Sequence, residues 1–350
     1  MSSLFTAMRM TSAMVTPKHN HFLKASIDKE PTLRPDMVEG ESRVQLPFRA
    51  MKILETPNVK DVYAVAIGVD GELCRLNAEW EPLEPHARPF PMSIQQAIIV
   101  DNLLIATWID RELLIARMAC LPLDQAFREG VERGDLRTAR NIEQAILPEG
   151  AVWAHVLDAE PLALATMDDG FCFVLWNRGI YAFNANGVER WRSPPPEWPK
   201  LSHLPMSQET VTLHETHSTI EVWSRAGGCL RLSKSNGSEI GSAHFELEGA
   251  LSSVYGTETQ RVLLLSDGRC YQYKSGSRIA DIATKGPIQH AFFMEDSVWV
   301  LSGWREEIAL SESGVTVKNQ DEVVVQHLMK DEQLWLLTND GLLAHSSLTE

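Results

Sequence analysis

Short runs of alternating hydrophobic and polar residues recur along the chain from about residue 44 onward. Each run begins at a glycine, as in "DGELCRLNAEW" or "DGRCYQYKSGS". Alternation with a period of two predicts half-buried strands, and Asp-Gly between two such runs predicts a tight hairpin turn. The glycines that open these runs are Gly71, Gly179, Gly228, Gly268 and Gly341.

Two further runs fit the same slot without a glycine. They are "DRELLIARMAC" around Arg111 and "REEIALSESG" around Glu306. The seven starting positions are then 71, 111, 179, 228, 268, 306 and 341, and their separations are 40, 68, 49, 40, 38 and 35 residues. Five of these six separations lie near the repeat of about 40 to 50 residues that is typical of propeller blades.

Each run has strand-like partners on both sides. Upstream, residues 93–108, 287–302 and 324–339 each hold a polar pair, an apolar run, an acidic turn and a second apolar run. Downstream, "GVERWRS", "SEIGSAHFEL", "SRIADIAT" and "GVTVKN" supply a fourth strand. Four strands per unit, repeated seven times, predict an all-β fold, a seven-bladed β-propeller that spans residues 43–350.

Residues 122–147 interrupt the pattern and account for the long separation. Leu136, Ala139, Ile142 and Ile146 recur at helical spacing, and Asp135 stands where a helix N-cap is expected. We predict two short helices joined near Gly134, inserted after the third strand of blade two. Removing about 26 residues brings the separation of 68 down to about 42, which restores the repeat.

The two ends of the chain have complementary features. Residues 1–42 are polar and broken by prolines, so we predict a flexible N-terminal arm without a signal peptide. The last repeat stops soon after its third strand, which would leave an open sheet edge. "SRVQLPF" at 42–48 is the natural candidate to fill that place and to close the ring.

One blade resembles a known family. "GIYAFNANGVERW" at 179–191 is similar to the repeat of quinoprotein-type (PQQ-like repeat) β-propellers, which place a glycine, an aromatic-Ala pair, a turn glycine and a tryptophan at similar spacing. The matching residues are Gly179, Tyr181, Ala182, Gly187 and Trp191. The resemblance implies the fold alone and does not carry over a quinone cofactor.

Charge and cysteine usage narrow the class of protein. The chain has 47 acidic and 32 basic residues, a formal charge of -15, and no run of Lys or Arg. Such a surface repels phosphate groups, so we expect no nucleic-acid partner and no membrane partner. Five cysteines without a CxxC pair indicate buried thiols in a reducing compartment, and we therefore expect a cytoplasmic protein.

Motifs that would identify an enzyme are missing from the sequence. There is no GxSxG, P-loop or GxGxxG motif, and "HETH" at 214–217 places two histidines three apart in a strand-like segment. Residues three apart on a strand point to opposite faces, so this pair does not form the zinc site of a helical HExxH motif. We predict no catalytic set, no metal site and no cofactor.

Two groups of residues are candidates for binding. Polar pairs at corresponding places of the inner strands would ring the mouth of a central channel, where they bind a small ligand or hydrogen-bond one another and water. The channel candidates are Gln96, Ser253, His290 and His327. The candidates for partner binding are Phe127, Arg128, Arg133 and Arg137 of the insertion, together with Trp191 and Trp198, which flank the proline-rich loop "RSPPPE". Trp108, Trp176 and Trp223 are expected to pack in the core.

The favoured function is a non-catalytic scaffold for protein-protein interaction, as one subunit of a larger assembly. Because propellers serve as companion subunits of ATPase systems, an ATPase-containing assembly is one expected partner by analogy. Two alternatives stay open: a hydrolase or lyase with its site at the channel mouth, and a sensor that binds a small ligand there without turnover.

Overall fold

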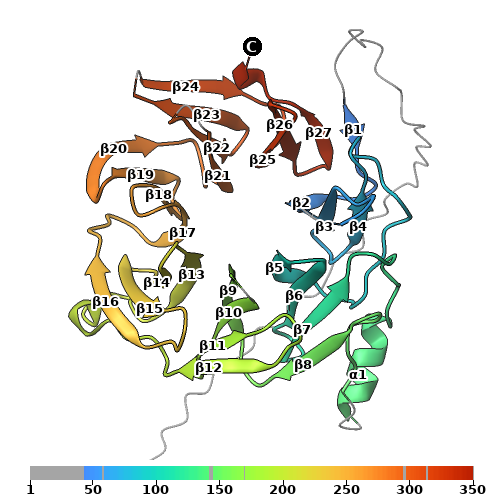
Figure 1. Ribbon diagram of the computed structural model, residues 1–350. Coiled ribbons are helices and arrows are strands. Elements are labelled where there is room, and N and C mark those ends of the chain that lie inside the picture. Colours follow the sequence, from blue (N-terminus) through green and yellow to red (C-terminus); the bar gives the residue numbers. More distant parts are fainter. Residues whose placement is uncertain are drawn as a thin grey trace, which may run out of the picture. The chain divides into compact units, whose positions relative to one another are not determined.

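A computed structural model describes residues 43–349, apart from 57–58, 142–144, 169, 295–296 and 313. Within residues 41–350 the strands form seven sheets arranged in a ring (Figure 1). The predicted seven-bladed β-propeller is therefore confirmed. The predicted arm, residues 1–42, lies outside the described residues.

Successive strands of each blade run antiparallel from the centre of the ring outward (Figure 1). The innermost strands are β2 (Ala50–Glu55), β5 (Ile94–Val100), β9 (Pro161–Met167), β13 (Thr210–Glu215), β17 (Leu251–Gly256), β21 (His290–Phe293) and β25 (Val324–Lys330). The second strands are β3 (Ala64–Gly68), β6 (Leu103–Asp110), β10 (Gly170–Leu175), β14 (Thr219–Ser224), β18 (Gln260–Leu265), β22 (Trp299–Gly303) and β26 (Gln333–Thr338). The third strands are β4 (Leu73–Leu76), β7 (Ile115–Pro122), β11 (Gly179–Phe183), β15 (Gly228–Ser233), β19 (Arg269–Lys274), β23 (Glu306–Ser311) and β27 (Leu342–His345).

The outer position is filled in three different ways. The outer strands of blades two to six are β8 (Trp153–Leu157), β12 (Glu189–Ser193), β16 (Glu239–His244), β20 (Ser277–Ala283) and β24 (Gly314–Asn319). Blade seven takes its outer strand from the start of the described chain, β1 (Val44–Gln45), which pairs with β27. Blade one has two isolated bridges instead, from Leu73 to Ala87 and from Leu76 to Pro82. Prolines cannot donate to a ladder, so the proline-rich segment 82–91 forms no regular strand there.

The recurring glycines lie where the second strand turns into the third. Gly71, Gly268 and Gly341 each have φ near +90° and precede the third strand of their blade. An L-residue with a side chain is strained in this region, which explains why the turn repeats a glycine. The seven turns between second and third strands, together with the links from each blade to the next, lie on one face of the ring. We call it the connection face.

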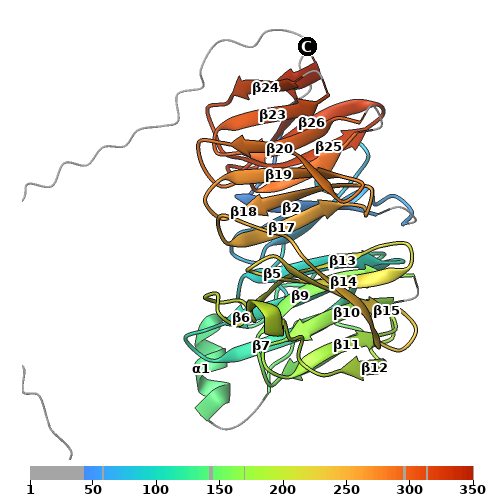
Figure 2. The ribbon, with the colours of Figure 1, turned by 90° about the vertical axis from the view of Figure 1, so that its left-hand side faces the viewer.

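The described residues of the insertion into blade two hold one α-helix, whereas the sequence predicts two. Helix α1 (Arg133–Asn141) lies outside the ring next to β7 and β8 (Figures 1 and 2). Asp135 is inside the first turn, where its carboxylate accepts a hydrogen bond from the Glu132 backbone N–H at 3.1 Å. It therefore acts as the return half of a capping box, and the prediction that it is the N-cap is wrong. Leu136 and Ala139 are buried, as the helical spacing predicts.

A β-bulge recurs in the inner strands and shifts their alternation. In six of them the pairing with the second strand skips one residue near the start, namely Met51, Gln95, Leu162, Val211, Ser252 and Val325. In blade seven, Val324 pairs with Thr338 and Gln326 with Leu337. A bulge adds one residue to one strand. Every side chain after it therefore lies on the opposite face from the one that strict alternation along the sequence predicts.

The five cysteines are all buried and free. They lie in β4, β7, β10, β15 and β19 of separate blades, and burial raises the pKa of the Cys74 thiol to about 11 and of Cys120 to about 12. A thiol with a raised pKa is a poor nucleophile at neutral pH, so these residues serve as small core hydrophobes.

Candidate functional site

The channel candidates do not form one ring of equivalent positions. The residue that follows the bulge is Gln96 in blade two, Ser253 in blade five and Gln326 in blade seven. His327 comes one residue later, so its side chain points to the opposite face of its strand. It is 0% exposed and does not line the channel. The prediction that His327 belongs to a channel-mouth site is wrong, because the sequence pattern equates His327 with Gln96, whereas the structure gives that position to Gln326.

Gln326 joins blade seven to blade one instead of facing a ligand. Its side-chain oxygen accepts the Ile53 N–H at 2.7 Å, and its nitrogen donates to the Ile53 carbonyl at 2.9 Å.

His290 is half-buried and packs edge to face on Tyr255 of the neighbouring blade, with ring centroids 5.2 Å apart. Burial, with the nearby charges of Lys52 and His327, lowers the pKa of His290 to about 3. A ligand role for Gln96, Ser253 and His290 stays a prediction.

His327 is the centre of a buried polar cluster between blades six and seven. Its Nε2 donates to the Glu307 carboxylate at 2.9 Å, and the Ser302 hydroxyl lies 2.7 Å from its Nδ1. These three side chains have the order Ser, His, acid that hydrolases use, but all three are 0% exposed. A substrate cannot reach this serine in the present structure, so the cluster is a link between blades.

Glu307 stays ionised within this cluster. Burial alone would raise its pKa, but the hydrogen bonds from His327, Ser346 and Ser347 outweigh that effect and lower the pKa to about 2. Each oxygen has several donors, among them Gln320 Nε2 at 2.5 Å and Ser347 Oγ at 2.8 Å. A carboxylate that accepts several hydrogen bonds favours its charged form.

We expect this carboxylate to stabilise the fold above about pH 4.5 and to lose that effect at lower pH. Because the folded pKa lies below the unfolded one, the stabilising free energy disappears as the pH falls from about 4.5 to about 2. The shift corresponds to about 3 kcal/mol at neutral pH. Urea unfolding of the unaltered chain and of Glu307→Gln between pH 7 and pH 3 should show a stability gap that narrows as the pH falls. A gap that stays constant would contradict this assignment. Glu258→Gln, at an exposed turn, is the matched control.

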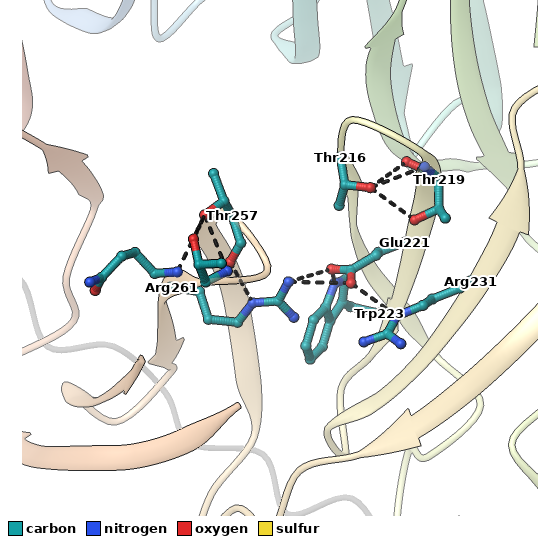
Figure 3. A network of polar contacts seen from close by, with 9 residues as sticks. Thr216, Thr219, Glu221, Trp223, Arg231, Thr257 and Arg261 are labelled. Atoms are coloured by element: carbon teal, nitrogen blue, oxygen red, sulfur yellow. Dashed lines mark hydrogen bonds and ion pairs between the residues drawn. The ribbon is translucent and has the colours of Figure 1, made fainter. Parts of the chain in front are cut away.

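A second buried cluster joins blades four and five (Figure 3). Glu221 on β14 is 0% exposed and pairs with Arg261 on β18, which is 3% exposed, at 3.1 Å. Trp223 Nε1 donates to the same carboxylate at 3.2 Å, and Arg231 Nε donates to it at 3.4 Å. The Arg261 guanidinium also lies 5.2 Å from the centre of the Trp223 ring. This pair fixes two neighbouring blades to each other.

The residues of the insertion hold it against the ring. Phe127 is buried in the core of blades one and two, so it is not available to a partner. Arg133 pairs with Asp110 at 2.6 Å and with Glu112 at 2.8 Å, and Arg137 pairs with Glu112 at 3.3 Å. These two arginines therefore attach α1 to the β6–β7 turn. Arg128 is exposed. A partner role for the three arginines stays a prediction.

Trp191 and Trp198 are buried, so neither presents the exposed surface that a partner-binding residue needs. Their exposed fractions are 8% and 4%. Trp191 Nε1 donates to the Lys234 carbonyl at 2.9 Å. The Trp198 indole covers Gly228, where an added Cβ would lie 2.4 Å from the ring. Both indoles fit against blade four because its backbone has no side chain at the contact points.

The two tryptophans anchor a rib of residues 194–197 with the sequence "PPPE" that stands between two surface pockets. Pockets of about 630 Å³ and about 560 Å³ lie on either side of it, and Pro195, Pro196 and Glu197 line both. Gln208 supports the rib, because its side chain accepts the Trp198 N–H at 2.9 Å and donates to the Trp198 carbonyl at 3.1 Å. We call the larger pocket the rib pocket.

Trp176 forms one wall of the rib pocket and is 47% exposed. The sequence analysis placed it in the core with Trp108 and Trp223, and for Trp176 this is wrong. Both of the others lie within second strands and are 0% exposed, whereas β10 ends at Leu175 and Trp176 is the first residue of the turn. Trp304 has the same place after β22 and is 51% exposed. In both turns the tryptophan directly precedes a polar residue, Asn177 or Arg305, that has positive φ in the structure. This tryptophan-polar pair at the end of an apolar strand is the signal in the sequence.

Known proteins resemble this chain in structure only. No protein-family model matches it, and no curated protein matches its sequence. The β-propeller domain of Cps50 (Swd1) from Myceliophteria thermophila is 11% identical with a TM-score of 0.60, and the match covers 89% of this chain and 98% of that domain. BamB from Moraxella catarrhalis is 11% identical with a TM-score of 0.50, and the match covers 82% of each chain. The resemblance to PQQ-like repeat propellers is confirmed for the fold.

The described residues lack both a metal-binding cluster and a membrane-spanning helix. The part of the chain that the structure describes holds no group of three or more His, Cys, Asp or Glu side chains that could bind a metal ion. Within the same residues no helix has both the length and the apolar character that a membrane crossing requires.

Proposed function

We propose that this chain is a protein-interaction scaffold that uses its connection face. The observation that carries the proposal is the exposure of Trp176 and Trp304, about half of each side chain, on two turns of that one face. Tryptophans are enriched among the residues that contribute most of the binding energy at protein interfaces. The propeller fold of the structural neighbours is consistent with an interaction role.

The shape of the connection face supports the same function. The rib pocket opens beside Trp176, and a pocket of about 440 Å³ lies between blades one and two, where Arg88, Asp110 and Arg133 are among its lining residues. A rigid ring that presents several separate recesses suits the simultaneous holding of partners. We propose that the assembly is cytoplasmic, as the free cysteines favour, and that an ATPase-containing complex is among its partners.

Chemical cross-linking in native lysate tests the proposal. Proteins that co-purify with the chain should cross-link to residues of the connection face, and the double variant Trp176→Ala/Trp304→Ala should lose them. ATP hydrolysis in the captured fraction would identify the ATPase class of partner. Recovery of the chain alone, or of partners that the double variant retains, would argue against the proposed face.

A further inference from the structure

The rib pocket contains a buried hydroxyl without a partner. Thr210, the first residue of β13, is 3% exposed and lines the pocket. Its Oγ1 has no hydrogen-bond partner among the residues that the structure describes. A buried polar atom without a partner is costly, and most such atoms in native proteins are satisfied by a neighbour, a water or a ligand. A bound molecule gains a hydrogen bond here when the Thr210 side chain turns toward the pocket that it lines.

Much of the remaining pocket wall is apolar and rigid. Trp176 provides an exposed aromatic surface on one side, and Pro195, Pro196 and Pro199 provide ring surfaces on the other. Prolines have fixed φ and little side-chain entropy, so this wall loses little freedom when a ligand binds. Grooves of this kind accept extended peptide segments, whose backbone is already close to its bound form.

The charge of the pocket is negative. Glu197 is exposed and makes no ion pair among the described residues, and the same holds for Glu239 in the pocket beyond the rib. The nearby arginines are already neutralised: Arg178 pairs with Asp158 at 3.1 Å and Arg192 pairs with Glu189 at 2.7 Å. Lys200 lies close in sequence but lines neither pocket. A ligand that crosses the rib therefore meets carboxylates that need a cation.

We propose that the rib pocket binds an extended segment of a partner protein that carries an apolar side chain and, close to it, a lysine or arginine. The apolar side chain packs on Trp176, the basic side chain pairs with Glu197, and Thr210 donates its hydroxyl hydrogen to a backbone carbonyl of the segment. This inference rests on the proposed scaffold function and names the partner chemistry of one site on its surface.

The test uses a displayed library of random ten-residue peptides, selected on the full chain. We expect enrichment of peptides with a basic residue within a few positions of a proline, aromatic or aliphatic residue. A fluorescent copy of the leading peptide then reports affinity by anisotropy. We expect at least tenfold weaker binding to Trp176→Ala, because truncated aromatic anchors lose the most affinity. The matched control is Ile279→Ala, an equally exposed apolar side chain on the outer strand β20 of blade five, which should bind normally.

Two further variants distinguish a local effect on peptide binding from a general loss of structure. Thr210→Val should weaken binding severalfold while leaving the thermal unfolding midpoint equal or higher, since it replaces an unpaired buried hydroxyl by a methyl group. Glu197→Lys should reject the leading peptide and accept a copy with glutamate in place of the basic residue. Enriched peptides without basic residues, no enrichment at all, or equal binding to Trp176→Ala would each overturn the proposal. Partners cross-linked elsewhere on the connection face would still leave the scaffold function standing.

Discussion

Removal of residues 1–48 is expected to lower the thermal unfolding midpoint by roughly 10 °C or more, or to cause aggregation. The reason is that β1 closes blade seven: Val44 pairs with Leu343, and the Leu46 N–H donates to the Gly341 carbonyl at 2.9 Å. Leu46 is 2% exposed and packs in the core shared by blades one and seven. Without this segment the edge of β27 is unpaired and that core is open to water.

The matched control is a chain that starts at Arg43 and keeps every described contact of β1. It should unfold at a midpoint at least several degrees above that of the longer truncation. Leu46→Ala is the point variant for the case in which the longer truncation does not fold. It should lower the free energy of unfolding by about 2–4 kcal/mol, because it truncates a buried leucine. Equal unfolding midpoints for the two truncations, with a neutral Leu46→Ala, would mean that β1 does not close the ring.

Glu221→Ala is expected to destabilise the chain by about 3–5 kcal/mol, because it leaves the Arg261 guanidinium charged and buried without its partner. Arg261 has few other acceptors: its Nε donates to the Thr257 carbonyl at 3.1 Å, and its guanidinium lies over Trp223 (Figure 3). Urea unfolding measures the change. The lost contact lies between blades four and five, so amide hydrogen exchange should increase first in β14 and β18.

Arg231→Ala serves as the control for the same carboxylate. Its side chain is 37% exposed and its ion pair with Glu221 spans 3.4 Å. We therefore expect the free energy of unfolding to fall by no more than about 1 kcal/mol. Replacing both buried partners, with Glu221→Leu and Arg261→Met, should cost less than Glu221→Ala alone, since no charge is then stranded. An effect of Glu221→Ala no larger than that of Arg231→Ala would show that the pair contributes little.

Much of the candidate site was out of reach of sequence reasoning. Trp191 and Trp198 flank a proline-rich loop, and nothing local shows that both indoles turn inward onto Gly237 and Gly228 of the next blade. The lining of the rib pocket therefore includes the prolines, Glu197 and Trp176, and not the two tryptophans that the sequence suggested for partner binding. Thr210 could not be selected in advance, because a missing hydrogen-bond partner is a property of the packed structure.

The sequence by itself determined the number of blades, the four-strand order and the closure by residues 42–48. These depend on local physics: alternation sets which residues form strands, and a glycine with positive φ marks the turn between second and third strands in five of the seven blades. Only the tertiary structure decided which side chains face the channel, the neighbouring blade or the solvent. A single bulged residue in an inner strand reverses the alternation beyond it, so His327 became a buried link while Gln326 took the equivalent position. Contacts between blades join residues far apart in the chain, and no periodicity within one blade encodes them.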